Sequence, residues 1–311
     1  MLTLLSGGLS VSLETWSITR RGQICCDRNT MSENNDTDNS SSGSMAAKLY
    51  ADIAVDYNAT KSNPFKRYVE ESTFASALCP SDDSSLSAQH VLDLGCGAGH
   101  YCRILKTEWD ANSVRGVDVS EQMLAEAKRQ EEVAPLGIQY LRQDLLSPSA
   151  AEKITTSFGA PIADLVTAQY LLPYAANKDE LNQLCVTAAA LVKHGGGRFV
   201  SIVSMLSDSI ISASKEGHLE SKDLGWAATW EGEAHDGMCV ELTLFGEARA
   251  SRVSFPNYLW SRESIEVALS SVGFGKVEWI PIEVDDGAPE TVRRSSVDIN
   301  KTPIGVFVAS M

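Results

Sequence analysis

The chain has 311 residues, of which 43% are hydrophobic, so it can bury one large core with extensions rather than two equal domains. Its formal net charge of -15 argues against a nucleic-acid partner, because binding of phosphates requires a basic surface. The longest apolar runs have the length of strands and fall short of the roughly 18 residues that a membrane span requires. We therefore expect a small-molecule substrate and no membrane partner.

The seven cysteines and five histidines show none of the spacings that are typical of disulfide frameworks or metal sites. We accordingly expect no metal and a cytoplasmic, reducing compartment. The first 30 residues carry three arginines, which leaves organelle targeting as an alternative. Residues 32–44 (SENNDTDNSSSGS) contain no apolar side chain and cannot offset the entropy of ordering. Residues 1–45 are thus predicted to be a disordered extension of a domain at 46–311.

Residues 46–88 are expected to form N-terminal cap helices. Apolar side chains recur there at the spacing of helical turns, and Pro64 interrupts the pattern.

The next segment, HVLDLGCGAGH at 90–100, reads as a buried strand that runs into a glycine-rich turn and then a helix. Gly95, Gly97 and Gly99 remove Cβ atoms from one edge of the turn, so backbone amides can approach a ligand. The G-x-G-x-G spacing departs from the G-x-G-x-x-G of dinucleotide-binding turns. Asp93, two residues earlier, would repel a pyrophosphate and favours a cationic ligand. An ordinary tight turn is the alternative.

Asp118 ends the following strand, which is predicted at 114–118, and Ser120 is placed to cap a helix that begins at Glu121. A carboxylate at the carboxyl end of a strand can accept two hydrogen bonds from a ribose diol. This feature does not distinguish NAD from other nucleosides.

Two further strands are predicted to end near polar or aromatic residues. The first lies within 138–145 and ends at Asp144, and the second begins at Ala163 and continues into a loop with Tyr170 and Tyr174. The reacting centre is expected near that loop.

The remaining elements follow in order. A helix is predicted over 179–193, ended by glycines, and a strand over 198–204. Residues 208–259 break the alternation of strands and helices, and we expect a substrate lid with short antiparallel strands. A helix over 261–272 and strands over 277–284 and 303–309 complete the chain.

These motifs resemble those of the class I S-adenosylmethionine-dependent methyltransferases, whose first motif is similar to VLDLGCGAG at 91–99. The resemblance implies an α/β fold with a Rossmann-like, doubly wound sheet of about seven strands, mostly parallel with an antiparallel last strand. Over residues 46–311 the pattern resembles a small-molecule branch that includes toxoflavin-pathway enzymes of secondary metabolism.

The resemblance also implies which residues bind S-adenosylmethionine. In the family, the acid at the Asp93 position and the glycine turn hold the methionyl end, and the residue at the Asp144 position takes the adenine. Tyr57 would cover the sulfonium, with packing at a helix end as the alternative. The full expected set is Tyr57, Asp93, Gly95, Cys96, Gly97, Gly99, Asp118, Val119, Met123, Asp144, Leu145 and Gln169.

The implied reaction is in-line displacement by a nitrogen or oxygen nucleophile of the acceptor. Alignment and exclusion of water carry most of the catalysis, because a sulfonium is already an activated leaving group, so a dedicated base is not required. Candidates for shaping the pocket are Tyr170, Tyr174, His235 and Tyr258, with packing as the alternative for each. An NAD-dependent oxidoreductase and a non-catalytic cofactor-binding protein are the alternative functions, and the chain is expected to be a monomer or homodimer.

Overall fold

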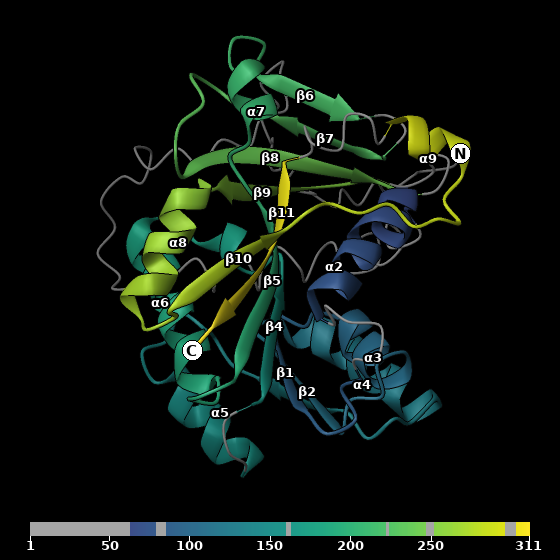
Figure 1. The fold of residues 1–311 in the computed structure, drawn as a ribbon, viewed down its shortest axis with the longest axis vertical. Coiled ribbons are helices and arrows are strands. Elements are labelled where there is room, and N and C mark those ends of the chain that lie inside the picture. Colours follow the sequence, from purple (N-terminus) through teal and green to yellow (C-terminus); the bar gives the residue numbers. More distant parts are fainter. Residues whose placement is uncertain (1–62, 79–84, 160–162, 222–223, 247–251, 296–302) are drawn as a thin grey trace, which may run out of the picture. The chain divides into compact units, whose positions relative to one another are not determined.

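The structure is a computed structural model that describes residues 63–78, 85–159, 163–221, 224–246, 252–295 and 303–311 (Figure 1). All of them belong to the unit Ser40–Met311. Tyr57, the expected extension at 1–45 and most of the expected first cap helix lie outside the described residues.

The main sheet has seven strands in the order β10-β11-β5-β4-β1-β2-β3. Strands β1 to β5 are parallel, whereas β11 lies antiparallel to both of its neighbours. The predicted fold class is confirmed, including the antiparallel last strand. The bounds of the strands are β1 His90–Leu94, β2 Ser113–Asp118, β3 Gln139–Arg142, β4 Leu165–Gln169, β5 Arg198–Ser204, β10 Lys276–Ile280 and β11 Ile304–Ser310.

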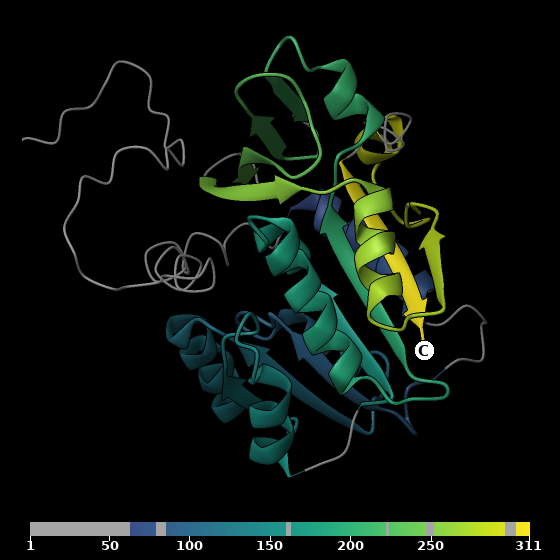
Figure 2. The same ribbon diagram turned by 90° about the vertical axis from the view of Figure 1, so that its left-hand side faces the viewer.

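Helices cover both faces of this sheet (Figure 2), which explains why the central strands are apolar on both sides. In β1, Val91 packs with one layer of helices, whereas Leu92 and Leu94 pack with the other. The first layer contains α2 Glu71–Leu78, α3 His100–Thr107 and α4 Glu121–Val133. The second contains α5 Ala150–Phe158, α6 Lys178–Leu191 and α8 Arg262–Ser271.

The helix starts follow local capping rules. Ser120 Oγ accepts a hydrogen bond from Met123 N at 3.3 Å before α4, as predicted, and Ser261 Oγ accepts one from Ser264 N at 3.2 Å before α8.

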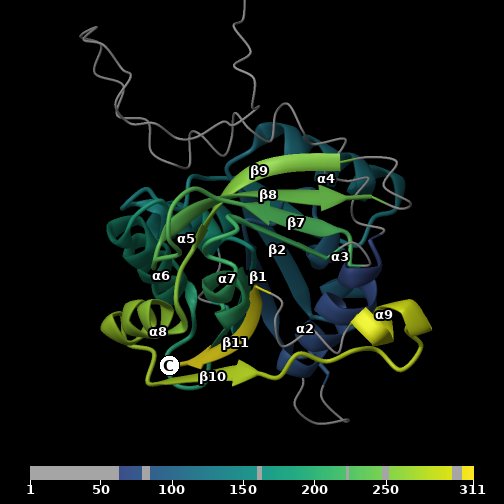
Figure 3. The ribbon, with the colours of Figure 1, turned by 90° about the horizontal axis from the view of Figure 1, so that it is seen from above.

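Residues 208–259 form α7 Asp208–Ser212 and a second, antiparallel sheet in the order β6-β7-β8-β9. The second sheet lies across the carboxyl ends of the parallel strands (Figures 1 and 3). Its strands are β6 His218–Ser221, β7 Trp226–Thr229, β8 Met238–Phe245 and β9 Arg252–Leu259.

A helical segment that begins at Pro64 joins the two sheets. It contains η2 Lys66–Glu70, a turn of π-helix, and continues as α2. Asn63 Oδ1 accepts from Phe65 N at 2.8 Å, and Asn63 Nδ2 donates to the carbonyls of Gly225 and Phe245, each at 3.1 Å. The start of the segment is thereby fastened to β7 and β8, while Phe74 is buried against the main sheet.

The strand predicted over 277–284 ends earlier, at Ile280, because the chain then leaves the sheet to bond with the helical segment. Glu283 N donates to Thr73 Oγ1 at 2.9 Å, and Asp285 N donates to the carbonyl of Tyr68 at 2.8 Å. The chain then forms α9 Glu290–Ser295.

Candidate active site

The glycine turn after β1 combines a packed side with an open side. Gly97 and Gly99 have φ values of 54° and 80°, which disfavour any residue with a side chain. A Cβ on Gly99 would lie 2.4 Å from the hydroxyl oxygen of Tyr140, whereas a Cβ on Gly97 would meet nothing within 4 Å. Gly99 is therefore required for packing, and Gly97 leaves room for a ligand.

Asp118, at the end of β2, holds the turn through its carboxylate. Oδ2 accepts from Gly97 N and Oδ1 accepts from Ser120 N, both at 2.8 Å. Burial raises the pKa of Asp118 above its ordinary value, and the backbone amides of Ser120 and Gly97 oppose that effect. Each carboxylate oxygen has two acceptor positions, so the group retains capacity for two further donors such as a ribose diol.

Asp93 lies deeper, in the sheet itself. It is 1% exposed, and its oxygens accept from Thr167 Oγ1 at 2.8 Å and from the Cys102 thiol at 3.3 Å. The Cys96 thiol also points beneath the turn, because a Cβ on Gly116 would lie 2.7 Å from Cys96 Sγ. Burial raises the pKa of Cys96 to about 11, so the thiol stays protonated. Cys96 can thus face a ligand only through its backbone.

Other residues that were expected to bind the cofactor lie near the carboxyl ends of β2 and β3. Gln143 N donates to the carbonyl of Asp118 at 3.0 Å, which brings the next residue, Asp144, beside the end of β2. Asp144 Oδ1 accepts from Leu146 N at 2.9 Å. Met123 and Leu145 are buried, whereas Val119 is half-buried.

Gln169 ends β4 on the other side of β1. Its Nε2 is buried, and among the described residues it has no hydrogen-bond partner. Such an orphaned donor is uncommon in a folded protein and indicates a missing acceptor. The open face of Gly97, the capacity of Asp118 and this donor fit a nucleoside ligand with polar ends.

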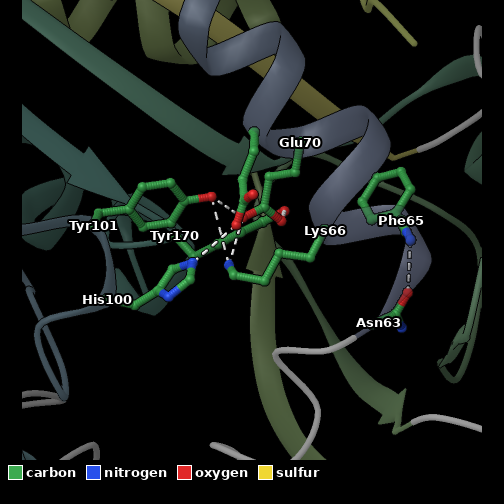
Figure 4. Close-up of polar contacts among 8 residues, drawn as sticks. Asn63, Phe65, Lys66, Glu70, His100, Tyr101 and Tyr170 are labelled. Carbon is green, nitrogen blue, oxygen red and sulfur yellow. Dashed lines mark hydrogen bonds and ion pairs between the residues drawn. The ribbon is translucent and has the colours of Figure 1, made fainter. Parts of the chain in front are cut away.

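Glu70 is the centre of a buried polar cluster next to the glycine turn (Figure 4). Lys66 Nζ lies 2.6 Å from Glu70 Oε1, and the Tyr101 hydroxyl also donates to that oxygen. The Tyr170 hydroxyl donates to Oε2 at 2.6 Å. The cluster thus connects η2 with the first turn of α3 and with the end of β4.

The charge of Glu70 is stabilised despite its burial. Desolvation works to raise its pKa, but the Lys66 ammonium and the hydrogen bonds from Lys66, Tyr101 and Tyr170 hold the pKa below its ordinary value. Burial and the neighbouring Glu70 carboxylate raise the pKa of Tyr101. At neutral pH the Glu70 carboxylate is therefore charged beside the Lys66 ammonium, and the Tyr101 phenol is protonated.

Tyr170 adopts a φ of 59°, which is unusual for an aromatic residue and costs on the order of 1–2 kcal/mol. Its N–H donates to the carbonyl of Ile202 at 2.7 Å, and its hydroxyl is fixed by Glu70. The surrounding contacts thus hold Tyr170 in a strained backbone conformation.

The acceptor pocket, as we call it, lies between the second sheet and the end of β4. It encloses about 900 Å³, including solvent at its mouth. Its lining residues come from η2, the end of β4 and the inner face of β7, β8 and β9: Asn63, Phe65, Lys66, Glu70, Tyr170, Tyr174, Ser204, Leu224, Trp226, Ala228, Val240, Leu242, Leu244, Phe255, Asn257, Leu259, Pro303 and Ile304.

Two of the four residues expected to shape the pocket line it, namely Tyr170 and Tyr174, the latter in η3 Leu172–Tyr174. His235 does not: it is exposed, and its Nδ1 lies 2.9 Å from the carbonyl oxygen of Glu233. In β9 the alternation of side chains turns Asn257, rather than Tyr258, toward the pocket.

The cluster around Glu70 was missed from the sequence. The only local signal for it is the spacing of four residues between Lys66 and Glu70 in KRYVE, and such pairs usually lie on solvated helix faces.

Within the described ranges, no group of three or more His, Cys, Asp or Glu side chains could hold a metal ion. Nor does that part of the chain contain a helix with the length and apolar character needed to cross a membrane.

Residues 91–196 match the family model described as a methyltransferase domain. A curated relative, the ubiquinone biosynthesis O-methyltransferase of Coxiella burnetii, is 33% identical over 120 residues, which are 39% of this chain and 46% of that protein. The chain therefore spans about half the length of the curated relatives that it matches.

Solved structures share the fold over most of the chain. The CcbJ methyltransferase from Streptomyces caelestis superposes with a TM-score of 0.51 at 19% identity, covering 88% of this chain and 98% of that one. The DhpI-SAM-HEP complex gives a TM-score of 0.52 at 16% identity, covering 88% and 100%. Residues 91–196 thus match a methyltransferase domain, and the chain with its seven-stranded sheet shares the fold of these two solved structures.

Proposed function

We propose that this protein transfers a methyl group from S-adenosylmethionine to a small molecule held in the acceptor pocket. The observation that carries the proposal is the position of Glu70 and Tyr170. Both line the acceptor pocket, and their cluster includes Tyr101, two residues after the glycine turn. The turn after β1 and the ends of β2 and β4, which we call the cofactor edge, adjoin the pocket through this cluster, and this proximity supports the proposal of methyl transfer.

The residues of the cofactor edge would bind and orient the methyl donor. Asp118 would accept hydrogen bonds from the ribose, Asp144 would meet the adenine, and Gln169 Nε2 would donate to a polar group of the ligand. The open face of Gly97 would let the backbone approach. When bound, the sulfonium supplies an electrophilic methyl carbon and a good leaving group.

The chain's other contributions are alignment of the acceptor and exclusion of water. Glu70 is a poor general base, because three donors stabilise its charge and lower its pKa. The proposal therefore favours a nucleophile that needs no strong base, such as a neutral nitrogen or an acidic hydroxyl. In-line geometry follows from an acceptor that approaches from the pocket side.

We further propose that the second sheet, residues 208–259, is the acceptor-binding lid of a domain that spans 46–311. Its inner face supplies most of the pocket's apolar wall. A cytoplasmic location is proposed from the composition, and a monomeric or homodimeric state stays a prediction.

The test is an assay for the demethylated cofactor. The purified chain is incubated with S-adenosylmethionine and fractions of a metabolite extract, and mass spectrometry follows both cofactor and acceptor. We expect one fraction to drive release of S-adenosylhomocysteine and to yield a product heavier by one methylene unit. Asp118→Ala should lose this activity, whereas Glu132→Ala, at an exposed position of α4, should keep it.

Two results would contradict the proposal. Binding of the cofactor without turnover on any fraction would favour a non-catalytic protein. Tighter binding of NADH than of S-adenosylmethionine would favour an oxidoreductase.

A further inference from the structure

The wall of the acceptor pocket that β7, β8 and β9 supply is almost wholly apolar, with two exceptions. Trp226 on β7 and Asn257 on β9 are the lining residues of this wall that carry a polar side-chain atom. The apolar remainder consists of Ala228, Val240, Leu242, Leu244, Phe255 and Leu259.

Both polar atoms are buried and unpaired. Asn257 is 1% exposed, and its Nδ2 donates to the carbonyl of Pro256 at 3.0 Å, which fixes the orientation of the amide. Its Oδ1 has no partner among the described residues, and neither has Nε1 of Trp226. Buried polar atoms are nearly always hydrogen-bonded, so two exceptions in one pocket indicate ligand groups as the partners.

The two atoms differ in what they require. An amide oxygen only accepts hydrogen bonds, and an indole N–H only donates one. A ligand must therefore offer a donor to Asn257 and an acceptor to Trp226.

The strand register shows that Trp226 and Asn257 lie far apart on the second sheet. Trp226 lies opposite Leu244 of β8, and Asn257 lies opposite Val240, four residues away along the same strand. Four residues of a strand span about 13 Å, and β7 and β9 lie a further two strand spacings apart, about 10 Å, on either side of β8. The donor and the acceptor of the ligand therefore belong at opposite ends of an extended molecule.

Charge is balanced within the pocket. Its lining includes one ammonium, Lys66, and one carboxylate, Glu70, and these two groups lie 2.6 Å apart. A charged ligand would give up its hydration without gaining an uncommitted counter-ion from this pair.

We propose, on the basis of the methyl-transfer function proposed above, that the acceptor is an extended, uncharged and largely apolar molecule. One end donates a hydrogen bond to Asn257 Oδ1, and the other accepts one from Trp226 Nε1. A hydroxylated bicyclic nitrogen heterocycle has this chemistry.

The test measures binding with defined probes, without turnover. The probes are a hydroxyquinoline whose hydroxyl lies far from the ring nitrogen, its methyl ether, the naphthol of the same shape and the corresponding naphthoate. Each is titrated calorimetrically into the full chain in the presence of S-adenosylhomocysteine. We expect the hydroxyquinoline to bind at least tenfold more tightly than each of the other three.

Variants assign the preference to the two residues. Asn257→Leu should bind the hydroxyquinoline and its methyl ether within twofold of each other, and Trp226→Phe should do the same for the hydroxyquinoline and the naphthol. Tyr258→Phe, adjacent to Asn257 but on the other face of β9, is the matched control and should keep both preferences. Circular dichroism shows whether each variant folds. If one does not fold, the other still tests the hydrogen bond that its own residue is proposed to make with the ligand.

The inference is overturned if the native chain lacks the tenfold preference, if naphthoate binds as tightly as the hydroxyquinoline, or if a folded variant keeps the preference that it should lose. Failure of S-adenosylhomocysteine to bind would instead contradict the proposed function.

Discussion

The amide nitrogen of Gly97 lies 2.8 Å from Oδ2 of Asp118, so a single carboxylate ties the turn after β1 to the end of β2. The two residues are 21 positions apart in the chain. The same carboxylate binds the N–H of Ser120, the residue that caps α4. The turn, the end of β2 and the start of α4 are thus connected before any ligand is bound.

Substitutions of Gly97 and Gly99 should distinguish an effect on cofactor binding from an effect on the stability of the fold. Gly97→Ala should cost about 1 kcal/mol of stability, because only the positive φ is unfavourable, yet it should weaken S-adenosylmethionine binding at least tenfold. Gly99→Ala should cost about 3 kcal/mol, because its Cβ also meets Tyr140. Urea unfolding and calorimetry measure the two effects. Equal losses of stability would contradict this account.

Removal of the Tyr140 hydroxyl should reduce the loss of stability that Gly99→Ala causes. The hydroxyl has no hydrogen-bond partner among the described residues, so Tyr140→Phe alone should change stability by less than about 1 kcal/mol. In the double variant, the cost of Gly99→Ala should fall by about 1 kcal/mol or more. A double-mutant cycle by urea unfolding tests this coupling, and strict additivity of the two substitutions would disprove the contact.

Glu70 should make the free energy of unfolding depend on pH in the acidic range. Its pKa in the folded protein lies below the ordinary value of 4.5, so its stabilising contribution is complete above pH 4.5 and is lost as the pH falls through the folded-state pKa. Glu70→Gln should cost about 3 kcal/mol at neutral pH, because it leaves the Lys66 ammonium without its carboxylate.

The difference between the native chain and Glu70→Gln should shrink as the pH falls below 4.5. Urea unfolding over a pH series measures it, with Glu132→Ala as an exposed control. A difference that stays constant across the series would show that the charge of Glu70 contributes nothing.

Asn63 should hold the second sheet to the helical segment. Asn63→Asp keeps an oxygen for the N–H of Phe65 but cannot donate to the carbonyls of Gly225 and Phe245. Loss of these two bonds should cost about 2 kcal/mol and speed hydrogen exchange in β7 and β8. Exchange rates that rise equally in β1 would instead indicate general destabilisation.

The sequence predicted those features of the fold that have local causes. The strand end at Asp118, the cap at Ser120 and the glycine turn are encoded within a few residues, and the structure has each of them. The parallel order of β1 to β5 follows from strands that alternate with helices.

Features with distant causes could not be predicted. Glu70 meets Tyr101 and Tyr170, which are 31 and 100 positions away, and no local pattern encodes those pairs. The choice of Asn257 over Tyr258 depends on the parity of β9, since a shift of one residue exchanges the two faces of a strand. The early end of β10 depends on Thr73, on a helix far earlier in the chain.

Calorimetric titration of S-adenosylmethionine into the native chain, Asp118→Ala and Glu132→Ala tests the central claim most directly. We expect binding to the native chain and to Glu132→Ala with equal affinity. We expect Asp118→Ala to lose about 1.5–3 kcal/mol of binding free energy, because it loses hydrogen bonds to a charged group. An unchanged affinity in a folded Asp118→Ala variant would contradict it.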